Sequence, residues 1–177
     1  MAKDIDHITS LEGHIHSILS ERLPRLLPGN NAPAVIDYYG GEFGTDDIIG
    51  TLDEMVSRGT HVLVSYMGGG ERKNGNTGRV SEGEVAFALY IAGRNLRGEK
   101  EQRRDIYPVI QASRVVLRMA QDTVLTGSMG DAAWKLKVEN IWPGDDSIVA
   151  SVPGVACMQL ELTADLTVLW EYPDDLT

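Results

Sequence analysis

The chain has 177 residues and a net charge of -10 at pH 7, with 26 acidic residues against 16 lysines and arginines. Phosphate contacts require basic side chains, so this balance argues against a general nucleic-acid-binding protein and favours an acidic, well-solvated surface. The single cysteine, Cys157, excludes an internal disulfide and a thiolate metal cluster, and the lack of a signal-peptide pattern or of an apolar run near ~20 residues predicts a soluble, cytoplasmic protein.

Two helices and two strands are predicted in the first part of the chain. Apolar residues recur at helical spacing over residues 5–26, and a Pro-Gly pair follows them. A short strand is expected at 34–39. A Thr-Asp-Asp cap then begins a second helix over 45–59, which a glycine ends, and residues 61–67 form a strand that is apolar on both faces except for one serine.

A glycine-rich segment without apolar side chains follows at 68–79, and we expect it to be a mobile loop joining two strands. It does not match a phosphate-binding P-loop, because Lys73 is followed by Asn74 and the segment leads into a strand. Its glycines and basic residues are candidates for contacts with a partner: Gly68, Gly69, Gly70, Arg72 and Lys73.

The most informative strand is predicted at 79–92, because residues 85–92 are apolar on both faces when extended. Such a strand belongs in the middle of a sheet that is covered on both sides. It ends in a polar segment that carries Arg94, Asn95 and Arg97. Three interpretations are open for this segment: a solvated strand end, ion pairs within the domain or between subunits, and contacts with a phosphate backbone. The net charge ranks protein–protein ion pairs above nucleic acid.

The second half of the chain predicts a third helix and several strands. The helix begins at a capping Asp105 and its apolar face runs to Val124. Half-exposed strands are expected at 134–139 and 148–152, with a turn at 142–146 between them.

Apolar and polar side chains alternate over an unusually long final segment, from Met158 to Tyr172. A strand of this length either bends at Ala164–Asp165 or extends beyond the domain to pair with a neighbouring chain, and residues 173–177 are expected to be a frayed tail. The order of elements predicts a single α+β domain over residues 1–177, with a mixed, largely antiparallel sheet and about three helices grouped mainly on one face.

Signatures of catalysis are weak in this sequence. Glu82 and Glu84 would lie on one face of a strand, as a pair of catalytic carboxylates does, although a solvated strand end is the more ordinary explanation. His14 and His16 are two apart on a helix, so they point to different faces and cannot share a metal ion. A nucleophile elbow is absent. We therefore expect no cofactor, no metal site and no enzymatic activity.

Three short motifs occur in order along the chain: Tyr39-Gly40-Gly41-Glu42-Phe43, then Val62-Leu63-Val64 with Tyr66-Met67-Gly68-Gly69, then the run from Val85 to Gly98. By the order and spacing of these motifs, the chain resembles the tail-terminator family of Mu-like contractile-tailed phages and prophages. The resemblance covers nearly the whole chain, from the first helix to the last strand.

The resemblance implies a small α+β structural protein of the virion that forms a hexameric ring, caps the growing tail tube and joins it to the head connector. Assembly would take place in the host cytoplasm, with tail tube or sheath and head-connector proteins as partners, without a membrane or a specific nucleic-acid sequence. The family offers no catalytic residues to carry over. We expect subunit contacts at Arg94, Asn95, Arg97, Trp170 and Tyr172. The alternatives are an adaptor for another tail or baseplate protein, which acts without a ring, and a small hydrolase that uses Glu82 and Glu84.

Overall fold

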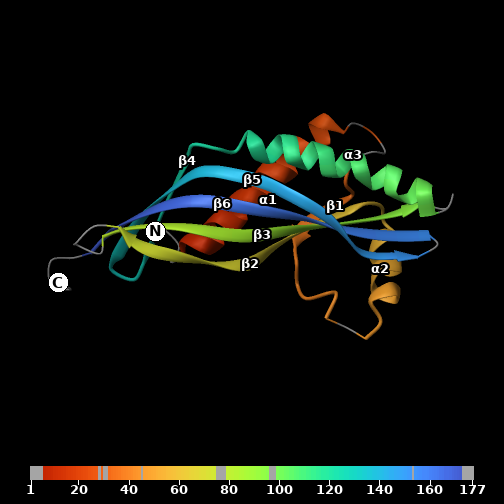
Figure 1. The fold of residues 1–177 in the computed structure, drawn as a ribbon, viewed down its shortest axis with the longest axis horizontal. Coiled ribbons are helices and arrows are strands. Elements are labelled where there is room, and N and C mark those ends of the chain that lie inside the picture. Colours follow the sequence, from red (N-terminus) through yellow and green to blue (C-terminus); the bar gives the residue numbers. More distant parts are fainter. Residues whose placement is uncertain are drawn as a thin grey trace.

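The computed structural model describes residues 6–27, 29, 32–44, 46–74, 79–95, 99–152 and 154–172, without the side chains of 73–74, 95 and 99–105. These residues form three helices and one six-stranded sheet (Figure 1). In chain order the elements are α1 (His7–Leu26), β1 (Val35–Tyr38), α2 (Ile48–Val56), β2 (His61–Asn74), β3 (Val80–Asn95), α3 (Glu99–Arg118), β4 (Thr123–Met129), β5 (Ala132–Val152) and β6 (Gly154–Glu171). The predicted α+β class is confirmed.

The strand order across the sheet is β1-β2-β3-β6-β5-β4. β1 and β2 are parallel, whereas each of the other neighbouring pairs is antiparallel. β3 lies inside the sheet between β2 and β6, which is the position that its two apolar faces predict. The sheet is therefore mixed and largely antiparallel, as expected.

The main hydrophobic core lies between one face of the sheet and the helices α1 and α3. α1 buries Leu11, Ile15 and Leu19 completely, at a spacing of four residues. Alternate residues of β3, among them Phe87 and Leu89, meet these helices from the sheet. Each fully buried side chain of this size contributes ~1.5–3 kcal/mol before conformational entropy is subtracted.

A smaller apolar cluster lies on the opposite face, where α2 covers one end of the sheet. Leu52 and Val56 of α2 pack on Ala92, Val155 and Cys157. Figure 1 shows α2 at the end of the molecule that lies away from both termini. Two of the three described helices thus share one face, in agreement with the prediction, and the rest of the opposite face carries no helix within the described ranges.

The glycine-rich segment is not a loop over most of its length. Residues 68–74 continue β2 and pair with residues 80–86 of β3 without interruption. Backbone hydrogen bonds do not require apolar side chains, so a long neighbouring strand is enough to hold this segment extended. A register shift after Tyr66 marks a bulge, and Gly68 there has a φ of 122°, which glycine adopts without strain. The rest of the predicted loop, residues 75–78, lies outside the described residues, as does the predicted tail.

The long C-terminal alternation is one unbroken strand inside the sheet. β6 continues through Ala164–Asp165 without interruption and has no free edge along its paired length, because it pairs with β3 on one side and with β5 on the other. The predicted turn at 142–146 is also part of a strand. β5 is continuous over its 21 residues and accommodates Pro143 and Gly144 through a register shift against β6.

Two helix starts differ from their predicted positions. α2 begins at Ile48, three residues after the expected start, where the side chain of Asp47 caps the helix by accepting a hydrogen bond from the backbone N of Gly50 at 2.8 Å. α3 begins at Glu99 instead of Asp105, since the intervening glutamate, lysine, glutamine and arginine residues all favour the helix.

The end of α3 also differs from the prediction. The helix stops at Arg118, and Val124 belongs to β4. Residues 123–129 of β4 pair with residues 132–138 of β5, and this hairpin was not predicted. Gly127 interrupts the alternation of side chains along β4, so the local sequence does not predict a strand there. In the structure its missing side chain leaves room for the indole ring of Trp134 on the opposite strand.

Replacing Gly69 with alanine tests the assignment of residues 68–74 to a strand. A Cβ at this position would lie 2.6 Å from the carbonyl oxygen of Glu84 on β3, so the two strands would have to separate. We expect G69A to lower the free energy of unfolding by ~1–3 kcal/mol in urea denaturation, the usual cost of overpacking. Gly70→Ala is the matched control, because a Cβ there meets nothing within 4 Å. Equal stability of the two variants would contradict the pairing.

Candidate functional site

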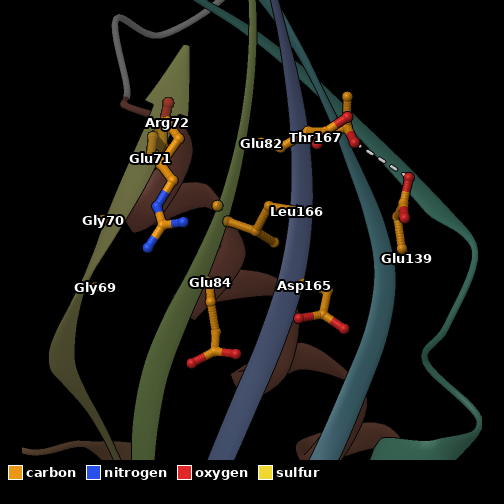
Figure 2. A pocket seen from close by; sticks show the side chains of 11 residues that line it. Gly69, Gly70, Glu71, Arg72, Glu82, Glu84, Glu139, Asp165, Leu166 and Thr167 are labelled. Atoms are coloured by element: carbon orange, nitrogen blue, oxygen red, sulfur yellow. Dashed lines mark hydrogen bonds between the residues drawn. The ribbon is translucent and has the colours of Figure 1, made fainter. Parts of the chain in front are cut away.

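The face of the sheet opposite α1 carries an open hollow with acidic walls (Figure 2). Glu82 and Glu84 lie two residues apart on β3, and Glu84 is directly opposite Asp165 of β6. Arg72 of β2 is opposite Glu82. Figure 2 shows the carboxylates of Glu84 and Asp165 in front of the strands, with α1 behind them. The hollow has a volume of about 1010 Å³ and is wide open to solvent.

The acidic side chains of this surface are held by partners on neighbouring strands. The hydroxyl of Thr167 donates a hydrogen bond to Glu139 Oε1 at 3.1 Å, and Lys137 Nζ lies 3.5 Å from the same oxygen. The side-chain amide of Asn140 donates to Asp165 Oδ2 at 3.4 Å. The two hydrogen bonds are partly buried, whereas the Lys137–Glu139 contact is about half exposed and contributes little to stability.

The chemistry of this surface is that of a charged wall and not of an enclosed pocket. Glu82 and Glu84 do share one face of a strand, as predicted. Substrate pockets normally surround most of the ligand with apolar walls and a few polar groups, which this open surface does not provide. In the part of the chain that the structure describes, no group of three or more histidine, cysteine or carboxylate side chains could hold a metal ion.

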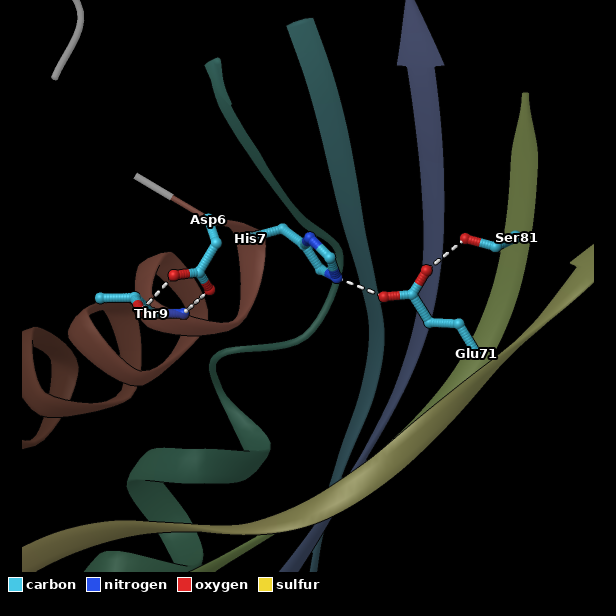
Figure 3. A network of polar contacts seen from close by, with 5 residues as sticks. All are labelled: Asp6, His7, Thr9, Glu71 and Ser81. Atoms are coloured by element: carbon cyan, nitrogen blue, oxygen red, sulfur yellow. Dashed lines mark hydrogen bonds and ion pairs between the residues drawn. The ribbon is translucent and has the colours of Figure 1, made fainter. Parts of the chain in front are cut away.

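A second polar arrangement joins the start of α1 to β2 and β3 (Figure 3). His7 Nε2 contacts Glu71 Oε1, and Ser81 Oγ donates a hydrogen bond to Glu71 Oε2 at 2.5 Å. The carboxylate is the central group, whereas in a Ser–His–acid relay the histidine stands between the other two. Ser81 is therefore not activated by His7. The imidazole also meets Trp134 and Trp170 edge-on, with ring centroids 6.2 and 5.5 Å away, so the arrangement stabilises this end of the core.

Asp6 fixes the position of His7 by capping α1. Its carboxylate accepts hydrogen bonds from the backbone N of Thr9 at 2.8 Å and from the Thr9 hydroxyl at 2.7 Å. Burial of Asp6 opposes ionisation, but these hydrogen bonds outweigh it and hold the pKa below its usual range. The cap is therefore charged at neutral pH and complements the positive end of the helix dipole.

The other histidines have structural surroundings, as the sequence favours. His16 Nε2 lies 3.0 Å from the carbonyl oxygen of Ile36, and its ring stacks on Tyr38 with centroids 4.6 Å apart. His61 Nδ1 lies 2.9 Å from the carbonyl oxygen of Gly59. The Nε2 atom of His14 is buried without a hydrogen-bond partner.

The polar end of β3 lies beside α2. Arg94 Nη2 is 3.8 Å from Asp53 Oδ1, and both side chains are about half exposed. This contact matches the predicted ion pair within the domain, and at this distance and exposure it contributes at most ~1 kcal/mol. The side chain of Asn95 and the whole of Arg97 lie outside the described residues.

The predicted aromatic contacts lie at the opposite end of the sheet. Trp170 is partly buried against the core, whereas Tyr172 is exposed, and their rings are nearly parallel with centroids 6.1 Å apart. The backbone N of Trp170 donates to the carbonyl oxygen of Arg79, just before β3 begins. Since Arg94 is near the other end of β3, the two predicted contact regions are ~48 Å apart along the strand and form two separate surfaces.

Sequence reasoning missed two members of the acidic surface, Glu139 and Asp165. They are remote in sequence from Glu82 and Glu84, and only the register of β6 between β3 and β5 brings them together. The partner of His7 was missed for the same reason, because Glu71 is 64 residues away along the chain. No local sequence signal marks either contact.

The comparisons with known proteins leave the function to be inferred from these surfaces. A scan of the chain against protein-family models finds no match, and a search of curated protein sequences finds none either. None of the helices in the described ranges combines the length and the hydrophobicity required to cross a lipid bilayer.

The chemistry of Cys157 can be tested by thiol labelling. Burial beneath α2 raises the pKa of this thiol to about 12, so only ~0.01% is thiolate at pH 8. We expect the native chain to resist Ellman's reagent for hours and to react within minutes in urea. An exposed cysteine in the Ser147→Cys variant is the control and should react at once. Rapid labelling of Cys157 in the native chain would contradict its structural role.

Desolvation of His14 predicts a loss of stability in mild acid. Burial and, to a lesser extent, the charge of Arg22 lower the pKa of His14 from 6.5. The unfolded chain then binds more protons as the pH falls below about 6.5, so the free energy of unfolding should decrease between pH 7.5 and pH 5. His14→Gln should show a smaller decrease in urea titrations at the two pH values. An identical decrease in both proteins would show that His14 is solvated.

Proposed function

We propose that this chain is a structural subunit of a phage tail, which assembles into a ring and caps the tail tube as a tail terminator does. The observation that carries the proposal is the open acidic face of the sheet, with Glu82, Glu84 and Asp165 at its centre. Carboxylates repel phosphate groups, so a wall of this kind allows DNA to pass along it without binding. Such a wall suits the channel of a ring between head and tail.

The motifs behind the resemblance converge in space, which supports the proposal. Tyr39 and Phe43 of the first motif have ring centroids 4.9 and 5.1 Å from that of Tyr90 in the third motif. The hydroxyl of Tyr90 donates to Met67 Sδ of the second motif at 3.9 Å. Side chains from all three motifs thus contact one another, and this packing explains why the motifs occur together in the sequence.

The separation of the two predicted contact regions also favours a ring. A closed ring needs heterologous contacts, in which each subunit uses two different surfaces. Arg94 lies at one end of the central strands, and Trp170 and Tyr172 lie at the other end. The ion pair of Arg94 with Asp53 is long and exposed, so the guanidinium can also approach a carboxylate of a neighbouring subunit.

Native mass spectrometry of the purified chain, alone and with tail tubes, tests this function. We expect a closed ring of identical subunits, and tubes that carry the ring at one end and no longer elongate. A chain that stays monomeric at high concentration and leaves tube growth unchanged would contradict the proposal. A stable one-to-one complex with a protein other than the tube would indicate the adaptor function instead.

A charge reversal makes the same experiment specific to the interface. Arg94→Glu should weaken subunit association by roughly tenfold, or ~1.4 kcal/mol. It should change the free energy of unfolding by less than ~1 kcal/mol, because the Asp53 contact is exposed. Arg25→Glu is the control, since Arg25 is also exposed and pairs only within α1, with Glu21 at 3.3 Å. Normal assembly of the Arg94→Glu chain would exclude Arg94 from the interface.

A further inference from the structure

The sheet leaves two strand edges open, on its opposite sides and at its opposite ends (Figure 1). β1 has four residues and pairs with β2 only at 61–64, so no described strand covers the outer edge of β2 from 68 to 74. β4 pairs with β5 only at 132–138, so no described strand covers the outer edge of β5 from 140 to 152. Open edges expose rows of N–H and C=O groups, which promote pairing with another chain unless they are blocked.

The open edge of β5 carries exposed apolar side chains, and two more lie just before the open edge of β2, an arrangement that a monomeric protein normally avoids beside an unpaired strand. On β5, the exposed fractions of Trp142, Ile148 and Val149 are 52%, 49% and 36%. Just before the open part of β2, Tyr66 and Met67 are 41% and 51% exposed. Large apolar residues in this position indicate a surface that becomes covered.

The two edges are complementary when copies of the chain stand side by side in the same orientation. β5 of one copy then runs antiparallel to β2 of the next, because three antiparallel pairings separate the two strands within a subunit. With Met67 opposite Val149, Glu71 falls opposite Asp145 and Arg72 falls opposite Gly144. This register brings exposed apolar side chains of the two edges together.

The offset between the two open segments matches the tilt that a closed sheet requires. Through the register, Glu71 aligns with Leu166 of β6, and Asp146 aligns with Leu160. The middles of the segments are therefore about six residues, or ~20 Å, apart along the strands. Four strand spacings, or ~19 Å, separate β2 of one copy from β2 of the next. These lengths give a strand tilt of ~45°, at the upper end of the range of about 35–45° in closed barrels.

We propose that the subunits join through these two edges, so that β5 of each copy pairs with β2 of the next and the sheets form one closed sheet around the ring. This inference rests on the ring function proposed above, and it adds the two strand edges to the contacts proposed there for Arg94, Trp170 and Tyr172. β1 would lie in line with β5 of the neighbouring copy, and β4 in line with β2 of the other neighbour. Since α1 and α3 occupy one face, the acidic face would line the channel, with α2 covering one end of it.

Cysteine cross-linking tests the edge pairing. Gly70→Cys places a thiol on the open edge of β2, where a Cβ meets nothing within 4 Å, and Ser147→Cys places one on the exposed part of β5. With a short bismaleimide, the double variant should give a ladder of covalent dimers, trimers and larger species that ends at the closed ring. A mixture of the two single variants should stop at dimers, because each copy then carries one thiol at one edge.

Two controls separate edge pairing from random collision. Each single variant alone should give no cross-link, since position 70 would never adjoin position 70 of another copy. The second control is the double variant Gly70→Cys/Lys135→Cys. Its β5 thiol takes the place of an exposed side chain, on the part of β5 that already pairs with β4. That double variant should give no ladder.

Hydrogen exchange on the unmodified chain provides a second measurement. Amides at 68–74 and 140–152 should exchange roughly tenfold more slowly, or slower still, in the ring than in the dilute monomer, whereas those of β6 should stay the same. A ring without this protection and without the ladder would overturn the edge pairing and leave the proposed function standing. A ladder without a closed ring would support the pairing and contradict the function. The absence of both would overturn both.

Discussion

The antiparallel pairing of β3 with β6 is the contact on which the rest of the structure depends. The strands are 16 and 18 residues long and pair from one end of the sheet to the other. β2 and β5 each pair with one of them, and α1 and α3 pack across them. The two strands are joined through α3, β4 and β5, so their pairing closes a long loop, and the burial of their alternate apolar residues offsets the entropy of closure.

One register determines both the core and the acidic surface. Because side chains alternate along a strand, the pairing that turns Phe87 and Leu160 toward the helices also turns Glu84 and Asp165 toward solvent on the other face. A slip by one residue would exchange the two sets and would bury the carboxylates. The stability of the subunit and the charge of its exposed face therefore follow from the same set of backbone hydrogen bonds, and neither can change alone.

The architecture separates the part of the sheet that stabilises the subunit from the parts available for assembly. The core beneath α1 and α3 lies along the two central strands, and each of these strands has a strand partner on both sides. The outer strands β2 and β5 are each covered over only part of their length, by β1 and β4. This separation of the core from the open strand edges is the arrangement that the proposed ring would require.

The sequence by itself determined the features that depend on local side-chain periodicity. The apolar positions of α1 repeat at helical spacing, and the two apolar faces of residues 85–92 place β3 inside the sheet. Each of these follows from which face of one element is apolar, so the local pattern is sufficient.

Only the tertiary structure decided the features that depend on pairing between distant segments. Residues 68–74 are extended because β3 lies beside them, although their glycines predict a loop. Glu139 and Asp165 join Glu84 through the register of β6, and Arg94 is separated from Trp170 because they lie at opposite ends of the same strands. Strand partners and register are properties of two chain segments at once, so no single stretch of sequence contains them.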